Sequence, residues 1–194
     1  MVPKFLFLCL LVGTVITTAK SAIGDVCPTS LLDKIDNFYL QEYNGYCFSF
    51  IVNFKRTFDE ASKQCAQDGG TLAMPKNKDL NDFLQNTAFD SYGSIDELWI
   101  GLHDKQKEGE FQWVDGSDVT WTRFAKGNGP LNIWLVKNVE DCAAIDPLDG
   151  YWHDSLCNNI LPVSVSVLNS KKGYICQYLK PQPGAMSTNT TSTT

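Results

Sequence analysis

The distribution of apolar positions divides the chain into two unlike halves. In the first half, two stretches carry apolar residues every three or four positions, the spacing of an amphipathic helix. In the second half, short runs rich in β-branched and aromatic residues are separated by Gly, Asn and Asp, which is typical of strands and turns. The pattern predicts an α+β fold, with early helices followed by a β-rich, loop-heavy region.

Each predicted helix begins at a side chain that can cap free backbone N–H groups. Thr57 is followed three residues later by Glu60, a capping-box pair, and the helix is expected over 58–68. Asn77 caps the second helix, which is expected to run to about residue 87. Two helices of ordinary length therefore precede the β-rich part.

Eight segments are expected to be strands because they combine β-forming residues with flanking turn residues. They are "YCFSFIVNF" (46–54), "TLAM" (71–74), "ELWIGLHD" (97–104), "EFQWVDGS" (110–117), "VTWTRF" (119–124), "CAAID" (142–146), "GYWHD" (150–154) and "GYICQY" (173–178).

The two ends of the chain differ in composition from the part between them. Residues 1–19 carry Lys4 and then an apolar run, and they end in small residues, as a secretory signal peptide does. A membrane anchor is the alternative, but the run is shorter than the roughly 20 apolar residues that span a bilayer. Residues 180–194 are rich in Pro, Ser and Thr and are expected to be a disordered tail, with Asn189 as an N-glycosylation candidate. The protein is expected to be secreted and extracellular.

Six of the seven cysteines follow the predicted signal peptide. An even number in a secreted chain indicates three disulfides, and the spacing leaves fifteen pairings open. A zinc cluster is disfavoured because the chain has no C-x₂-C pair and only two histidines. A catalytic thiol is disfavoured because no cysteine is left over.

Charge and motif content exclude several function classes. The formal net charge is −6, which argues against binding to nucleic acid or to anionic membranes. The chain has no G-x-S-x-G, no H-E-x-x-H and no phosphate-binding glycine loop, so we expect no enzyme. No segment after the signal is long and apolar enough to insert in a membrane.

Five short motifs follow one another in a fixed order: "WIGL" (99–102), "WVDGS" (113–117), "EDC" (140–142), "WHD" (152–154) and "YICQ" (174–177). In this order and spacing the chain resembles the C-type lectin-like domain in its long form, over about residues 27–179. The resemblance implies two helices flanking small antiparallel sheets, a long-loop region and three disulfides. The implied pairs are Cys27–Cys47, Cys65–Cys176 and Cys142–Cys157.

The resemblance also implies a place for calcium. Family members that bind sugars usually hold Ca²⁺ through Glu-Pro-Asn or Gln-Pro-Asp, a Glu, and Trp-Asn-Asp. Here Gly129 and Leu131 flank the loop proline, and His153 replaces the Asn. Only Glu140 and Asp154 remain as a weak metal-site remnant, whereas Ca²⁺ takes six to eight oxygens. No cofactor is therefore expected, and calcium is the one left open.

The candidate ligand-binding residues lie in or beside this long loop: Leu131, Asn132, Trp134, Glu140, His153 and Asp154. Trp134 is expected to anchor the loop core, and Leu131 to offer an apolar contact. We expect a recognition module that binds a glycan or an extracellular protein without the usual calcium site. A calcium-dependent, carbohydrate-binding lectin is the alternative. The cluster of His153 with carboxylates would also suit zinc, but a hydrogen bond from His153 to a neighbouring group is the favoured interpretation.

Overall fold

The computed structural model describes residues 22–130, 141–158 and 170–180 of the 194-residue chain. Its helices are α1 (Ala22–Val26), α2 (Thr29–Leu32), the 3₁₀ helix η1 (Asn37–Tyr39), α3 (Phe58–Gln67), α4 (Lys78–Asn86) and the π-helix η2 (Thr87–Ser91). Its strands are β1 (Leu40–Tyr43), β2 (Tyr46–Arg56), β3 (Thr71–Leu72), β4 (Leu98–His103), β5 (Gln112–Trp113), β6 (Cys142–Ile145), β7 (Trp152–Ser155) and β8 (Lys172–Leu179).

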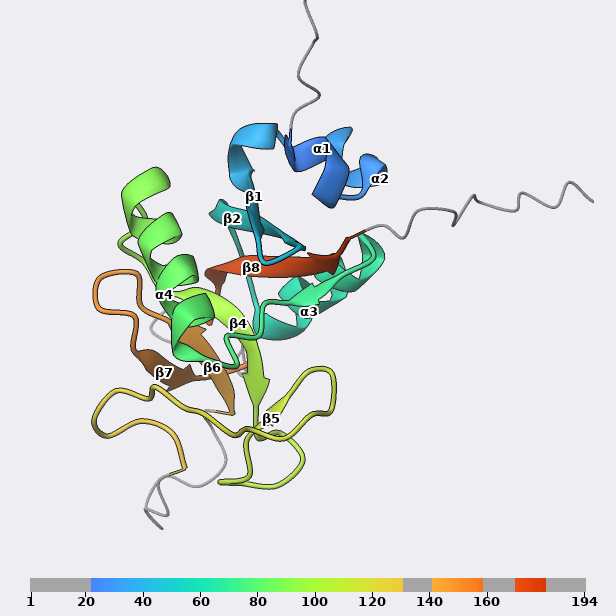
Figure 1. Cartoon of the computed structure of the whole chain (residues 1–194). Helices are drawn as coiled ribbons and strands as arrows, with labels where there is room; N and C mark the ends of the chain where they lie inside the picture. The colour runs from blue at the N-terminus through green and yellow to red at the C-terminus, as the bar shows by residue number, and fades with distance from the viewer. Residues whose placement is uncertain (1–21, 131–140, 159–169, 181–194) are drawn as a thin grey trace, which may run out of the picture.

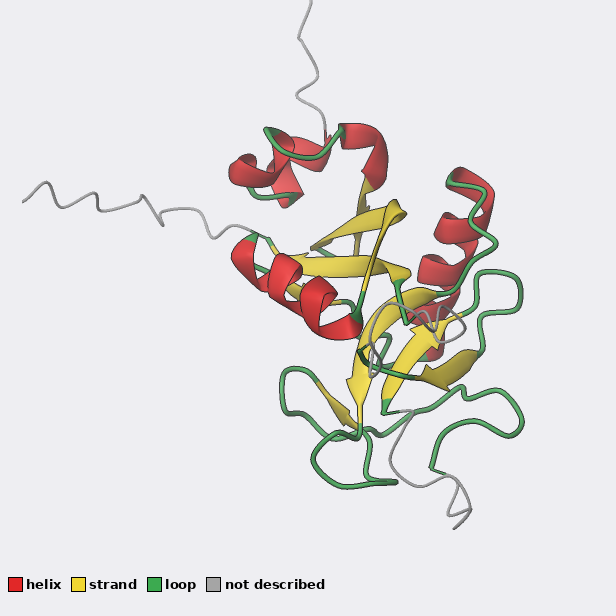
Figure 2. Cartoon of the chain, turned by 180° about the vertical axis from the view of Figure 1, so that it is seen from behind, coloured by secondary structure: helices red, strands yellow, loops and turns green. Residues whose placement is uncertain are grey.

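The strands join into one sheet with the order β1-β2-β8-β4-β6-β7, to which β3 adds beside β8 and β5 beside β4. Neighbouring strands are antiparallel except β4 and β8, which run parallel with Leu98 opposite Gly173. Figure 1 shows α3 and α4 on either side of this sheet, with α1 and α2 above it. Figure 2 shows the same arrangement from behind.

The central strands are buried on both faces because their alternate side chains enter two different cores. In β4, Trp99 packs in the core on the α3 side, whereas Leu98 and Ile100 pack in the core on the α4 side. In β8, Tyr174 packs in the core on the α3 side and Ile175 packs in the core on the α4 side. Burial on both faces explains why the run at 98–102 is almost continuously apolar instead of alternating.

The two predicted helices are present within a residue or two of their expected ends. α3 begins with the complete capping box, in which Thr57 accepts from the Glu60 N–H and Glu60 accepts from the Thr57 N–H. Asn77 caps α4 through the Leu80 N–H at 2.9 Å. Local hydrogen bonds at the helix N-termini were thus readable from the sequence.

Three features differ from the sequence expectation. The segment 119–124 forms no regular strand and contributes only the bridge from Phe124 to Trp152. α4 continues into the π-helix η2, because Ala88 is buried in the core and Tyr92 packs on Phe50 with ring centroids 5.1 Å apart. The small helices and β1 before residue 46 were not predicted, because they carry no clear periodicity.

The α+β class is confirmed, and the three disulfides are Cys27–Cys47, Cys65–Cys176 and Cys142–Cys157, the pairs that the resemblance implies. They tie the N-terminal segment to β2, α3 to β8, and β6 to the residues after β7. Within the described ranges, no helix is long and apolar enough to cross a membrane.

Candidate ligand-binding face

The structure describes two of the six predicted ligand-face residues, His153 and Asp154, which are neighbours in β7. Leu131, Asn132, Trp134 and Glu140 lie outside the described residues, as do the glycosylation candidate Asn189 and residues 1–19 and 181–194. The described part of the site consists of β7, the loop that leads up to Pro130, and the strand ends beside them.

Asp154 faces the loop that carries Gly129. Its Oδ2 accepts a hydrogen bond from the Gly129 N–H at 3.0 Å, and its own N–H donates to Asn128 Oδ1 at 3.2 Å. Burial raises the pKa of Asp154 above its ordinary value, the Gly129 N–H lowers it, and the charge of Glu108 raises it further. The carboxylate thus serves to fix the loop backbone.

Gly129 occupies a position that only glycine fits. Its φ is +84°, and an added Cβ would lie 2.6 Å from Cγ of the Phe124 ring. Phe124 in turn packs edge-on against Trp152 with centroids 5.5 Å apart. No side chain, and hence no side-chain oxygen, fits at position 129 without moving this aromatic contact.

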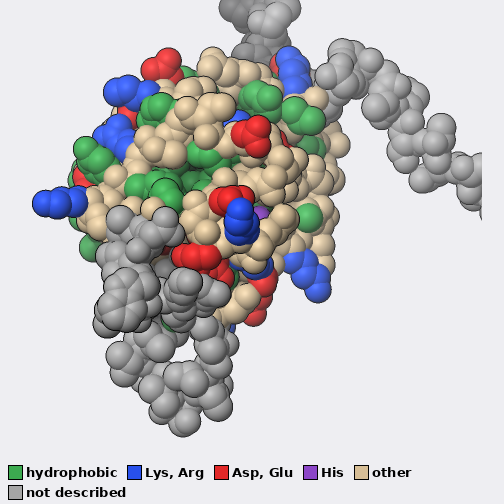
Figure 3. Space-filling view, turned by 90° about the horizontal axis from the view of Figure 1, so that it is seen from below, with side chains coloured by type: hydrophobic (Ala, Val, Ile, Leu, Met, Phe, Trp, Pro, Cys, Tyr) green, Lys and Arg blue, Asp and Glu red, His purple; other side chains and the backbone are tan. Residues whose placement is uncertain are grey.

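His153 points to a different neighbour from Asp154. Its Nδ1 lies 2.5 Å from Glu97 Oε1, and the Lys172 Nζ lies 2.6 Å from Glu97 Oε2. Burial raises the pKa of Glu97, but the hydrogen bonds from Lys172 and His153 outweigh it, so the pKa is lowered overall. Seen from below, acidic and basic side chains gather beside a histidine and a hydrophobic area (Figure 3).

The predicted hydrogen bond of His153 to a neighbouring carboxylate is therefore present, and the partner is Glu97. The zinc alternative gains nothing from this geometry. Among the described residues, no three His, Cys, Asp or Glu side chains come together as a metal site.

Asp104 is a residue that the sequence reasoning missed. It is 4% exposed, its Oδ2 accepts from the Gly109 N–H at 2.8 Å, and its Oδ1 is buried with no hydrogen-bond partner among the described residues. Burial raises the pKa of Asp104 to about 6, and the charges of Glu108 and Asp141 add to the rise. The available signal was an Asp at the end of an almost continuously apolar strand, where a carboxylate rarely lies without a role.

Three of the described tryptophans are core residues and not an exposed platform. Trp99, Trp113 and Trp152 are all at most 1% exposed. Trp152 donates from Nε1 to Asn81 Oδ1 at 2.7 Å, and Trp113 and Trp121 pack edge-on against it. This cluster supports β7 and the Gly129 loop from inside.

The family model for the Lectin C-type domain matches residues 54–163. The chain belongs to the C-type lectin domain family. Human tetranectin is 35% identical over 136 residues, which cover 68% of this chain and 59% of tetranectin. Human C-type mannose receptor 2 is 33% identical over 122 residues, which cover 63% of this chain and 8% of the receptor. The chain thus spans less than two thirds of the length of these relatives.

Solved structures of C-type lectin domains share the fold at low sequence identity. CEL-I from Cucumaria echinata superposes with a TM-score of 0.61 at 23% identity, covering 80% of this chain and 99% of CEL-I. A calcium-independent type II antifreeze protein gives 0.59 at 18% identity, covering 80% and 96%. At such identities the likeness establishes the fold alone. C-type lectin domains are generally non-enzymatic modules that recognise glycans or proteins.

The described residues of the loop face, Gly129, His153 and Asp154, each face another group of the protein. Position 129 admits no oxygen-bearing side chain, His153 is paired with Glu97, and the Asp154 carboxylate is bonded to a backbone N–H. A hard cation needs several converging oxygens. Asp104 is different, because its Oδ1 has no hydrogen-bond partner in the described part of the chain and its raised pKa favours the protonated form.

Proposed function

We propose that this chain is a secreted recognition module whose long-loop face binds a glycan or an extracellular protein without the usual sugar-binding calcium. The observation that carries the proposal is the contact between Gly129 and Asp154, with the Phe124 ring behind it. This contact uses the remaining described carboxylate to hold the backbone at the place where calcium would need it.

Three further observations support the proposal. The Cys142–Cys157 disulfide and the buried Trp152 cluster hold β6 and β7 rigidly beside the loop, as a binding face requires. The three disulfides suit an oxidising, extracellular compartment. The apolar residues around Trp134 in the sequence suit a drier contact than a sugar–calcium site.

A glycan array in calcium and in chelator tests the proposal against its alternative. A bound glycan whose signal is equal in both conditions supports it, and a signal that chelator abolishes supports a calcium-dependent lectin and overturns it. If no glycan binds, the protein branch is tested by pull-down from extracellular fluid, comparing wild type with Trp134→Ala. Retention of a partner by wild type alone supports the proposal, and equal retention or none contradicts it.

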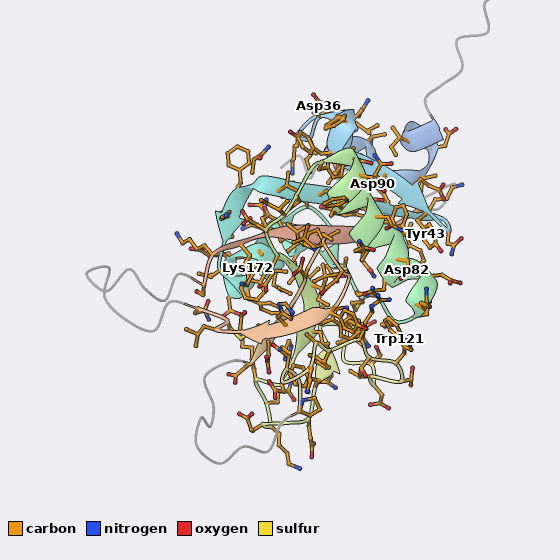
Figure 4. All side chains as sticks on the ribbon, turned by 90° about the vertical axis from the view of Figure 1, so that its left-hand side faces the viewer. Asp36, Tyr43, Asp82, Asp90, Trp121 and Lys172 are labelled. Carbon is orange, nitrogen blue, oxygen red and sulfur yellow. A yellow bond between two sulfur atoms is a disulfide. The ribbon has the colours of Figure 1, made fainter. Side chains whose placement is uncertain are left out.

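Calcium binding itself is best measured by melting temperature. We expect 5 mM calcium, a concentration chosen to saturate a site of about millimolar affinity, to have the same effect on wild type and on Asp154→Asn. Asp90→Asn is a matched control, because Asp90 is an exposed carboxylate on η2 (Figure 4). A calcium-induced rise that Asp154→Asn removes and Asp90→Asn keeps would contradict the proposal.

A further inference from the structure

A groove lies at the other end of the molecule, between the N-terminal helices and α3. We call it the N-terminal groove, and its volume is about 650 Å³. β2 and β8 form its floor, the segment 34–39 forms one wall and α3 forms the other. Figure 4 shows Asp36 at this end and Trp121 toward the opposite end. The volume lies within the range of small-molecule sites, roughly 300–1,000 Å³.

Both walls of the N-terminal groove are fixed to its floor. Cys27–Cys47 ties the N-terminal segment to β2, and Cys65–Cys176 ties α3 to β8. Lys34 Nζ also reaches across from the first wall to Asp68 Oδ1 at 2.8 Å. A groove with covalently anchored walls is preorganised, so a ligand loses little free energy in ordering it.

The charges around the N-terminal groove are balanced. Lys34 and Arg56 stand against Asp36 and Asp68. Burial raises the pKa of Asp68, but hydrogen bonds from Lys34 and Gln64 outweigh it, so the pKa is lowered and the carboxylate stays ionised. An anionic ligand would meet two carboxylates and a cationic ligand two basic groups, which favours a neutral ligand.

The polar groups of the groove both donate and accept hydrogen bonds. Asn53 and Gln64 carry amides, and the Tyr39 hydroxyl accepts from Asn53 Nδ2 at 3.3 Å. Beside them Phe54 also lines the groove and is 74% exposed. Amides next to an uncovered aromatic ring match a ligand with many hydroxyls and an apolar C–H face, and a pyranose ring has both.

We infer that the N-terminal groove is a second, calcium-independent binding site for the end of a neutral oligosaccharide, with Phe54 packing on a sugar face and Gln64 and Asn53 bonding its hydroxyls. The inference rests on one part of the proposed function, that the ligand is a glycan. It places that recognition on a different surface from the long loop. An extended peptide is the competing occupant, because no described strand pairs with residues 52–55 of β2.

The test is an array of immobilised oligosaccharides, neutral and acidic, read in chelator with four proteins. They are wild type, Phe54→Ala, Phe89→Ala and Trp134→Ala. Phe89 is the matched control, an exposed ring on η2 that does not line the groove. We expect neutral glycans to bind wild type, and Phe54→Ala to lower the affinity for them about tenfold or more. A tenfold loss corresponds to about 1.4 kcal/mol, the size expected for one aromatic contact. The Phe89→Ala variant should bind as wild type does. Because Phe54 is exposed, its variant should keep the wild-type melting temperature.

The outcomes separate this inference from the proposed function. Binding that falls in Trp134→Ala and not in Phe54→Ala supports the long-loop face and overturns the groove. Binding that falls in Phe54→Ala alone supports the groove. Absence of neutral-glycan binding, or binding of acidic glycans only, overturns the inference and leaves a protein ligand for the long loop. A displayed peptide library whose selected binders require Phe54 while the neutral glycans do not would assign the groove to peptides and likewise overturn it.

Discussion

Single residues decide what the loop face of this domain can hold. Gly129 admits no side chain because its backbone is left-handed and the Phe124 ring lies behind it. The Asp154 carboxylate accepts from the Gly129 N–H, and His153 lies within hydrogen-bond distance of Glu97, so both side chains already have a polar neighbour in the protein. Under the proposed function, a ligand at this face would therefore be bound by groups other than a shared metal ion.

Replacement of Gly129 by alanine should destabilise the domain by more than about 2 kcal/mol, through backbone strain and overlap with Phe124. Gly127→Ala is the matched control, because Gly127 also has a positive φ of +92° but an added Cβ there meets nothing within 4 Å. Urea unfolding of both variants measures the difference. Equal losses would mean that the Phe124 contact carries no cost.

Asp104 predicts a pH dependence of stability. Its folded pKa of about 6 lies above the ordinary aspartate pKa of 3.8 that holds in the unfolded chain, so the folded state holds the proton more tightly. The associated stability is fully present below about pH 4 and is lost as the pH rises through about 6. In chelator, Asp104→Asn should therefore stabilise the domain by about 1–3 kcal/mol at pH 7.5 and have little effect at pH 4.

Melting temperatures at the two pH values measure this effect, with the exposed Asp90→Asn as the control. A gain for Asp104→Asn that is the same at pH 4 and pH 7.5 would contradict a raised pKa. Calcium added at pH 7.5 extends the measurement, because a cation that replaces the proton would stabilise wild type and not the variant.

At the scale of elements, local signals predicted α3 and α4 well and the remainder less well. Thr57, Glu60 and Asn77 mark helix starts through hydrogen bonds to residues three positions away, which a sequence displays directly. The π-helix η2 is followed by Tyr92, which packs against Tyr39 of η1 and Phe50 of β2, both more than forty residues earlier in the chain. Long-range contacts of this kind leave no local pattern.

The capping box of α3 offers a test at this scale. Thr57→Ala removes the acceptor for the Glu60 N–H and should cost about 1 kcal/mol, whereas Thr57→Ser keeps the oxygen and should cost less. Urea denaturation midpoints at constant slope give the two values. A serine variant as unstable as the alanine variant would assign the loss to the Thr57 methyl group, which is buried.

At the scale of the whole molecule, the sequence predicted the fold class through its ordered motifs and its cysteines. The pairing of the cysteines came from the resemblance to C-type lectin domains, since fifteen pairings were open from the spacing alone. At the candidate site, the sequence displayed the departures from the family pattern at Gly129 and His153, and the hydrogen bond of His153 to a carboxylate is confirmed. The role of Glu97 and the buried Asp104 oxygen depended on strands brought together only in the folded sheet.

The disulfides should differ in their effect on stability. Cys65–Cys176 spans 111 residues and Cys142–Cys157 spans 15. In the chain-entropy model they contribute about 4.7 and about 3 kcal/mol. The double variant Cys65→Ala/Cys176→Ala should therefore unfold at a lower denaturant concentration than Cys142→Ala/Cys157→Ala. The opposite order would place the larger effect in native-state packing.

The pairing of β2 with β8 sets Tyr46 opposite Leu179, and α1 contacts β1 and β2, so both ends of the described chain lie on one side of the domain (Figure 1). Figure 1 shows β5 and β7 on the other side. A label, a surface linker or a fused protein attached at either end would therefore leave the long-loop face turned outward. The attached group itself would lie nearest to the N-terminal groove. Immobilisation through a terminus thus presents one of the two surfaces and crowds the other, and the choice of attachment point can by itself separate their binding.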